Sequence, residues 1–280
     1  MANRTASNFW HMKKQLKTFL FSLLAPGLGY LQNGDRKSFY KTIFLFFNVI
    51  ILGTTFRLFI SFWGLAAILF SLVSIYSFTA IHATLNAKTA NPQTKIAGLL
   101  KGSLTLAFLL ITGLSFANRR TTMGFDIMSM DVPVMQPTLL QGDRFLVDTW
   151  IMKSQLNRGT VVVHSFKGQQ GLYLNRIIAV GGDKVEIRDG VVFINEQVLK
   201  ESYVLPSNVT KPQSKNMQPA VISPGHFFVM GDNRDASFGD SRFSGTITIN
   251  NIVGKATDIV SSQDKSRIGA ILFNRINLKQ

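Results

Sequence analysis

The stretch Gly231–Gly245, GDNRDASFGDSRFSG, decides the fold of the second half of this chain. Within it, Asp, Asn, Arg and Ser side chains alternate with glycines. Carboxylates, guanidinium groups and hydroxyls spaced so closely are suited to a network of charge-assisted hydrogen bonds. We therefore predict that the stretch folds as turns around a buried polar network.

Short segments rich in Val, Ile and Phe lie on both sides of this stretch, and Gly, Asn and Asp separate them. This pattern predicts an antiparallel all-β domain from about Asp126. Arg188-Asp189-Gly190 is typical of a tight hairpin. Pro206 to Pro219, with three prolines and no periodicity, predicts a surface loop. The expected strands are Arg144–Asp148, Thr160–Val163, Leu172–Val180, Lys184–Ile187, Gly190–Ile194, His226–Met230 and Ile252–Val260.

The first half of the chain differs in composition. The whole chain is only 16% charged, against about 25% in soluble domains. Residues 1–132 contain 13 Lys and Arg but 3 Asp and Glu. Basic, acid-poor sequence interrupted by apolar runs indicates a membrane protein, and aromatics confined to those runs argue against nucleic-acid binding. The absence of cysteine excludes disulfides, thiolate catalysis and cysteine metal sites.

The apolar runs predict a membrane region over residues 18–120, after a basic cytoplasmic segment at 1–17. The run at 19–31 is too short to span and contains Pro26, Gly27 and Gly29, so we expect it to be re-entrant. Spans are expected at about 43–56, 58–81 and 96–117. Basic residues that flank the spans would be cytoplasmic, which makes the protein multi-pass and places the β domain, 121–280, outside.

Four segments of the second half resemble sequence boxes of the type I signal peptidases, membrane-bound Ser/Lys proteases that remove export signals. They are Asp131–Asp143 (DVPVMQPTLLQGD), Arg158–His164 (RGTVVVH), Tyr173–Asp183 (YLNRIIAVGGD) and Gly231–Gly245. The resemblance implies a fold similar to the signal peptidase catalytic domain, mainly β and preceded by an α-helical transmembrane region. It also implies a location at the bacterial cytoplasmic membrane.

The two catalytic positions of that family are substituted here. The resemblance puts the nucleophilic serine at Val134 and the general-base lysine at Asn175. Part of the family has a second serine near the nucleophile, and the resemblance puts this serine at Val132. Valine has no heteroatom to attack a carbonyl, and an amide has no basic nitrogen to take the proton. We therefore expect no hydrolysis. The register is fixed by a matching remnant of the nucleophile box: Met135, Pro137, Thr138, Gly142 and Asp143.

Other positions match the boxes or depart from them. Thr160, His164 and Ala179 replace Asp, Phe and Gly of the family pattern, and Gly239 is one residue more than it has. With asparagine at 175, we expect Ser237 to hydrogen-bond its amide, and Asp240 to pair with Arg242. The resemblance implies a supporting network of Arg176, Asp232, Asn233, Arg234, Ser237, Asp240, Ser241 and Arg242.

Other residues of the sequence offer alternative catalytic or metal-binding roles. Ser129 precedes a methionine as a nucleophile would, with Lys167 or Lys184 as a candidate base. However, a shift of five residues reverses the face of a strand, so an ordinary serine is favoured. His164 and His226 lack ligand-spaced partners and are expected to be packed or at the surface. We expect no metal or cofactor, because the acidic loop (Gly231–Gly245) lacks the ligand pattern of a calcium loop.

The favoured hypothesis is a signal peptidase homologue that has lost hydrolysis and binds extended exported segments by strand addition, or binds a membrane partner. Its partners would be signal peptides or such segments, the lipid bilayer and a possible membrane protein. The alternative is an active peptidase that uses Ser129. In a third hypothesis, the apolar first half of the chain carries the function. Loss of function on removal of residues 1–95 would favour this hypothesis.

Overall fold

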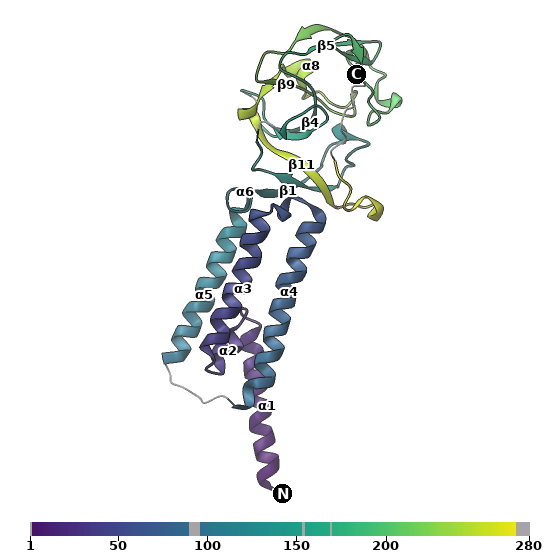
Figure 1. Cartoon of the computed structure of the whole chain (residues 1–280). Helices are drawn as coiled ribbons and strands as arrows, with labels where there is room; N and C mark the ends of the chain where they lie inside the picture. The colour runs from purple at the N-terminus through teal and green to yellow at the C-terminus, as the bar shows by residue number, and fades with distance from the viewer. Residues whose placement is uncertain (1, 90–95, 153–154, 169, 273–280) are drawn as a thin grey trace. The chain divides into compact units, whose positions relative to one another are not determined.

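The computed structural model describes residues 2–89, 96–152, 155–168 and 170–272. The chain forms two compact units. The helical unit comprises Met1–Phe59 and Trp63–Met123, and the β unit comprises Ile60–Phe62 and Gly124–Gln280. The predicted fold class, an antiparallel β domain preceded by an α-helical region, is confirmed (Figure 1).

The described part of the helical unit contains four long helices, α1, α3, α4 and α5, and shorter ones between and after them. Its core is formed by Ala25, Leu28, Tyr30, Leu31, Phe39 and Ala83. The helices are α1 (Ala2–Ser22), α2 (Leu28–Gln32), α3 (Arg36–Thr55), α4 (Phe62–Leu85), α5 (Ile96–Ala117) and α6 (Arg119–Thr122).

Local sequence explains where the first helices begin and end. The chain leaves α1 through a turn in which Gly27 has φ 82°, a conformation that glycine adopts without steric cost. Asp35 caps α3 by accepting a hydrogen bond from the backbone N–H of Ser38 at 3.0 Å. The apolar run at 19–31 is thus divided between the end of α1, the turn and α2.

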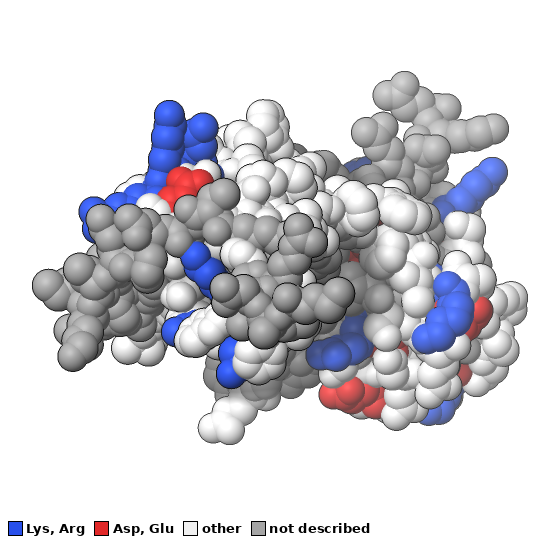
Figure 2. All heavy atoms as spheres, turned by 90° about the horizontal axis from the view of Figure 1, so that it is seen from below, with Lys and Arg blue, Asp and Glu red and all other residues white. Residues whose placement is uncertain are grey.

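Two of these helices, α3 and α4, are long and apolar enough to cross a membrane by length and composition, and Ser103–Ala117 is a shorter apolar helix segment. Phe44 on α3 and Phe70 on α4 are 71% and 75% exposed. Figure 2 shows more basic than acidic side chains on the face that it presents.

The β unit contains two antiparallel sheets. The seven-stranded sheet has the order β1-β2-β11-β3-β4-β9-β10, and the four-stranded sheet has the order β7-β6-β5-β8. The strands are β1 (Phe125–Ser129), β2 (Arg144–Asp148), β3 (Val161–His164), β4 (Tyr173–Val180), β5 (Lys184–Arg188), β6 (Val191–Ile194), β7 (Gln197–Val198), β8 (Met217–Val221), β9 (His226–Met230), β10 (Ile247–Thr248) and β11 (Ile252–Ser261).

The predicted hairpin joins β5 to β6. Arg188 pairs with Val191, and the two residues between them have positive φ, 49° at Asp189 and 84° at Gly190. Positive φ at both positions is the signature of a type I′ turn, whose twist matches that of the flanking strands.

The loop predicted from Pro206 to Pro219 is wrong in part. This region contains α7 (Pro212–Lys215) and most of β8, which pairs with β5. β8 lies at the edge of its sheet, includes Pro219 and exposes most of its side chains. An edge strand tolerates proline and needs no buried face, so its sequence carries no alternation. The short strands β7 and β10, and β1 after the last long helix, were not among the predicted strands.

Candidate functional site

The segment that carries Val134 is held in a short turn between β1 and β2. Pro133–Met135 forms one turn of 3-10 helix, in which Met135 is fully buried and Val134 is half-buried. The backbone carbonyl of Val134 accepts a hydrogen bond from the N–H of Asn233 at 3.0 Å. This hydrogen bond connects the nucleophile box to the acidic loop.

The end of the same box is anchored by Asp143. Its carboxylate accepts hydrogen bonds from the N–H of Leu140 and from Arg267, both at 2.9 Å. Burial alone would raise the pKa of Asp143, but the hydrogen bonds from Leu140 and Arg267 outweigh burial and hold this pKa below its ordinary value. The ionised carboxylate therefore fixes the turn before β2.

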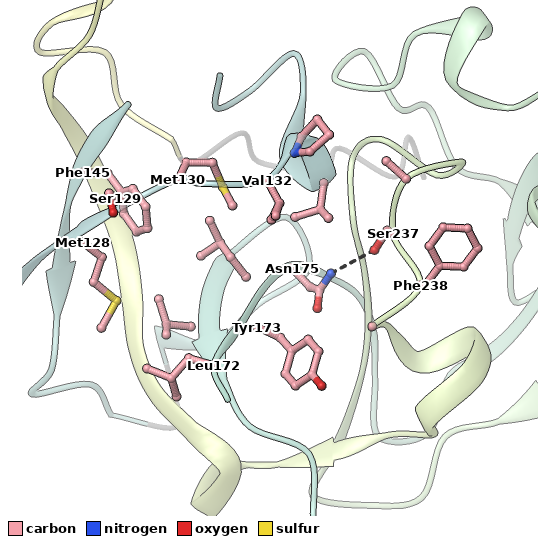
Figure 3. A pocket seen from close by; sticks show the side chains of 16 residues that line it. Met128, Ser129, Met130, Val132, Phe145, Leu172, Tyr173, Asn175, Ser237 and Phe238 are labelled. Carbon is pink, nitrogen blue, oxygen red and sulfur yellow. Dashed lines mark hydrogen bonds between the residues drawn. The ribbon is translucent and has the colours of Figure 1, made fainter. Parts of the chain in front are cut away.

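Asn175 lies on β4, beside β3, and is buried. It is paired with Val162, and His164 lies two residues further along β3 on the same face. The Nε2 atom of His164 is 2.8 Å from the Asn175 Oδ1. The Asn175 amide donates to the Ser237 Oγ at 3.4 Å (Figure 3), which confirms the expected hydrogen bond between Asn175 and Ser237.

His164 is fully buried, in an aromatic environment. Its ring lies 4.8 Å from that of Phe166 and 5.9 Å from that of Tyr173, centroid to centroid. Burial lowers the pKa of His164 below its ordinary value and outweighs the hydrogen bond with Asn175. His164 is therefore neutral near pH 7. The expectation of a packed histidine is confirmed, but sequence spacing did not indicate its contact with Asn175.

A buried ion pair lies on the other face of β4. Arg176 donates to both carboxylate oxygens of Asp232, at 2.9 and 2.6 Å, and to the carbonyl of Gly159 at 2.8 Å. The Thr138 hydroxyl donates to the same carboxylate. The guanidinium carbon is 4.1 Å from the ring centroid of Tyr203. This network joins the nucleophile box, β4 and the acidic loop.

The other arginines of the acidic loop also have partners. Arg242 pairs with Asp240 at 2.8 Å, as expected, despite the extra residue at Gly239. Arg234 pairs with Glu201 and donates to the carbonyl of Gly231 at 3.0 Å. No local spacing indicates a role for Glu201, because it is far from the acidic loop along the chain. Ser241, another predicted network residue, accepts from the N–H of Val229 at 2.9 Å.

A cavity of about 470 Å³ brings Val134, Asn175 and Ser237 together. Ser129 also lines it, at the end of β1 near Phe145 and well apart from Ser237 in Figure 3. The full lining is Met128, Ser129, Met130, Val132, Pro133, Val134, Phe145, Val163, Leu172, Tyr173, Leu174, Asn175, Ala236, Ser237, Phe238 and Gly239.

The chemistry that this lining offers is limited. It contains hydroxyls and one amide, but neither of the candidate bases Lys167 and Lys184 is part of it. Lys184 instead pairs with Glu196 in the other sheet. Within the described part of the chain, no group of three His, Asp or Glu side chains is placed to hold a metal ion.

Known proteins match the second half of the chain. Residues 102–260 match the family model of signal peptidase, peptidase S26. Thylakoidal processing peptidase 1 of Arabidopsis thaliana is 34% identical over 134 residues, which cover 44% of this chain and 38% of the relative. The probable signal peptidase I-1 of Synechocystis is 34% identical over 131 residues and is covered to 64% of its length.

Signal peptidase IB of Staphylococcus aureus is 35% identical over 139 residues, which cover 44% of this chain and 71% of the relative. A crystal structure of a signal peptidase I from Enterococcus faecalis is 27% identical and covers 35% of this chain and 94% of its own, with a TM-score of 0.32. The chain thus matches little more than a third of the length of thylakoidal processing peptidase 1 of Arabidopsis thaliana.

Proposed function

We propose that the β unit binds extended segments of exported proteins without hydrolysing them. The premise is that this chain belongs to the signal peptidase family, peptidase S26. Members of this family remove signal peptides. The observation that carries the proposal is that Val134 and Asn175, which the resemblance aligns with the family dyad, line the same cavity. Neither side chain supplies a nucleophile or a base.

The way in which a segment binds is part of the proposal. β1 is an edge strand of the seven-stranded sheet, and Met128 and Ser129 at its end line the cavity. A segment that pairs with this edge would gain main-chain hydrogen bonds and direct alternate side chains into the cavity. The supporting network of Arg176, Asp232 and Thr138 would then hold the cavity in shape, not take part in chemistry.

The membrane arrangement is likewise proposed. α3, α4 and α5 would cross a bacterial cytoplasmic membrane, with the basic loops inside and the β unit outside. The exposed phenylalanines of α3 and α4 support contact with lipid.

One experiment separates binding from catalysis. Purified full-length protein in detergent micelles is incubated with a preprotein that has a small-x-small signal junction, and with a fluorescent peptide of the same junction. We expect binding of the peptide by fluorescence anisotropy and no cleavage of the preprotein. Cleavage that is lost in Ser129→Ala would instead make the chain an active peptidase with a relocated serine.

The cavity is tested with a matched pair of substitutions. Val132 lines the cavity and is 50% exposed, whereas Val198 lies on β7 and is 55% exposed. We expect Val132→Trp to weaken peptide binding and Val198→Trp to leave it unchanged. Equal affinities in the two variants would contradict binding at this cavity.

A further inference from the structure

The acidic loop contains one residue more than the family pattern, and the structure shows where the extra length goes. Gly239 packs against Tyr173 so closely that a Cβ atom at this position would lie 2.4 Å from the ring. Ser237 and Asp240 on either side keep their hydrogen bonds to Asn175 and Arg242. The loop is therefore held by contacts on both sides of Phe238, which is itself exposed.

Phe238 stands at the mouth of the cavity. Phe238 lines the cavity and is 59% exposed, and Lys211 Nζ lies 5.4 Å from the centroid of its ring. Leu172, which is 52% exposed, is a second large apolar side chain of the lining. Apolar surface left open around a cavity is covered when a ligand binds.

The interior of the cavity is built from large and adaptable side chains. Met128, Met130, Phe145 and Leu174 line it, and methionine fits itself to irregular apolar ligands. Two of its polar groups, Asn175 and Ser237, are hydrogen-bonded to one another. Burial of apolar surface, more than hydrogen bonding, would thus provide the affinity.

The apolar lining distinguishes between classes of side chain. A methyl group would cover little of this lining, whereas a side chain such as Leu or Phe would bury more of it. We propose that the site selects an extended segment that carries a bulky apolar side chain, such as Leu or Phe, and that Phe238 is a specificity-determining residue that packs against it. This inference rests on the proposed function, because it names the segment that the same site would bind.

The test uses two fluorescent peptides that differ at one position. One carries Phe and the other Ala within the same polar, extended sequence, and both are titrated with full-length protein in micelles. We expect the Phe peptide to bind at least tenfold more tightly. Equal binding of the two peptides, or tighter binding of the Ala peptide, would overturn the inference but leave the proposed function standing. Binding of neither would overturn both.

Two phenylalanines of the same loop provide a matched control. Phe243 lies 6.1 Å from Phe238, centroid to centroid, and is 49% exposed, but it does not line the cavity. We expect Phe238→Ala to weaken binding of the Phe peptide about five- to tenfold, with Phe238→Leu intermediate and Phe243→Ala unchanged. Equal losses in the two alanine variants would refute a specific role for Phe238. Binding of a dye-linked dodecyl chain as tight as that of the Phe peptide would assign the cavity to lipid and also refute the inference.

Discussion

The Nε2 atom of His164 lies 2.8 Å from the Oδ1 atom of Asn175. The resemblance to the type I signal peptidase boxes implies that each of these residues replaces a different family residue, phenylalanine in one case and the general-base lysine in the other. The two departures are thus in contact in the folded protein. The buried Nε2 and Oδ1 atoms are hydrogen-bonded to one another, and removal of either side chain would leave the other atom without this partner.

We predict that the two substitutions are energetically coupled. His164→Phe leaves the Asn175 carbonyl oxygen unpaired, and Asn175→Leu leaves the His164 Nε2 unpaired, so each should cost about 1–3 kcal/mol of unfolding free energy. The double variant should cost less than the sum of the two by about 1 kcal/mol or more. Urea titrations of the full-length protein measure these values, and strict additivity would contradict the coupling.

The stability of the β unit should depend on pH through His164. Burial lowers the pKa of His164 in the folded protein, so the unfolded chain binds the proton more readily, with a pKa of about 6.5. Stability is therefore complete above about pH 6.5 and is lost as the pH falls from that value toward the lower folded pKa.

Thermal unfolding between pH 7.5 and 5 tests this dependence, with His164→Phe as the comparison. The variant should show a flatter profile over this window, although it is less stable at pH 7. The depressed pKa values of Asp143 and Asp183 contribute only in more acidic solution, below about pH 4. Identical slopes for both proteins would show that His164 is not the titrating group.

The ion pair between Arg176 and Asp232 should be essential to the fold. Both side chains have no exposed surface, so Arg176→Met leaves a buried carboxylate uncompensated, at a cost of about 3–5 kcal/mol. Lys184→Met, which removes a pair with the 76%-exposed Glu196, should cost less than about 1 kcal/mol. Comparable losses in the two variants, measured by urea titration, would contradict the structural role of the network.

Restoring the dyad should require three substitutions. A lysine at position 175 must be neutral to act as a base, but the neighbouring imidazole of His164 would accept a hydrogen bond from the ammonium and favour its charged form. Val134→Ser with Asn175→Lys should therefore cleave a preprotein more slowly than the triple variant that adds His164→Phe. Rates at pH 8 in micelles provide the measurement, and faster cleavage by the double variant would show that His164 does not oppose the base.

Much of the β unit could be predicted because its strands alternate or are continuously apolar. β2 and β9 begin and end at the predicted residues. β8 was missed because an exposed edge strand with Pro219 has no buried face to produce a pattern. Glu201 and His164 were missed as site residues for a related reason. Their partners, Arg234 and Asn175, are 33 and 11 residues away along the chain, so no local spacing indicates the contacts.

The sequence by itself determined the class of the fold and the family boxes. Through the resemblance it also implies that Val134 and Asn175 stand at the dyad positions, where residue types limit what chemistry is available. Only the tertiary structure decided what replaced that chemistry. Backbone pairing of β3 with β4 brings His164 to Asn175, and the packing of Gly239 on Tyr173 places Phe238 at the mouth of the cavity. Contacts between residues distant in sequence depend on strand register and packing, which the order of residues does not state directly.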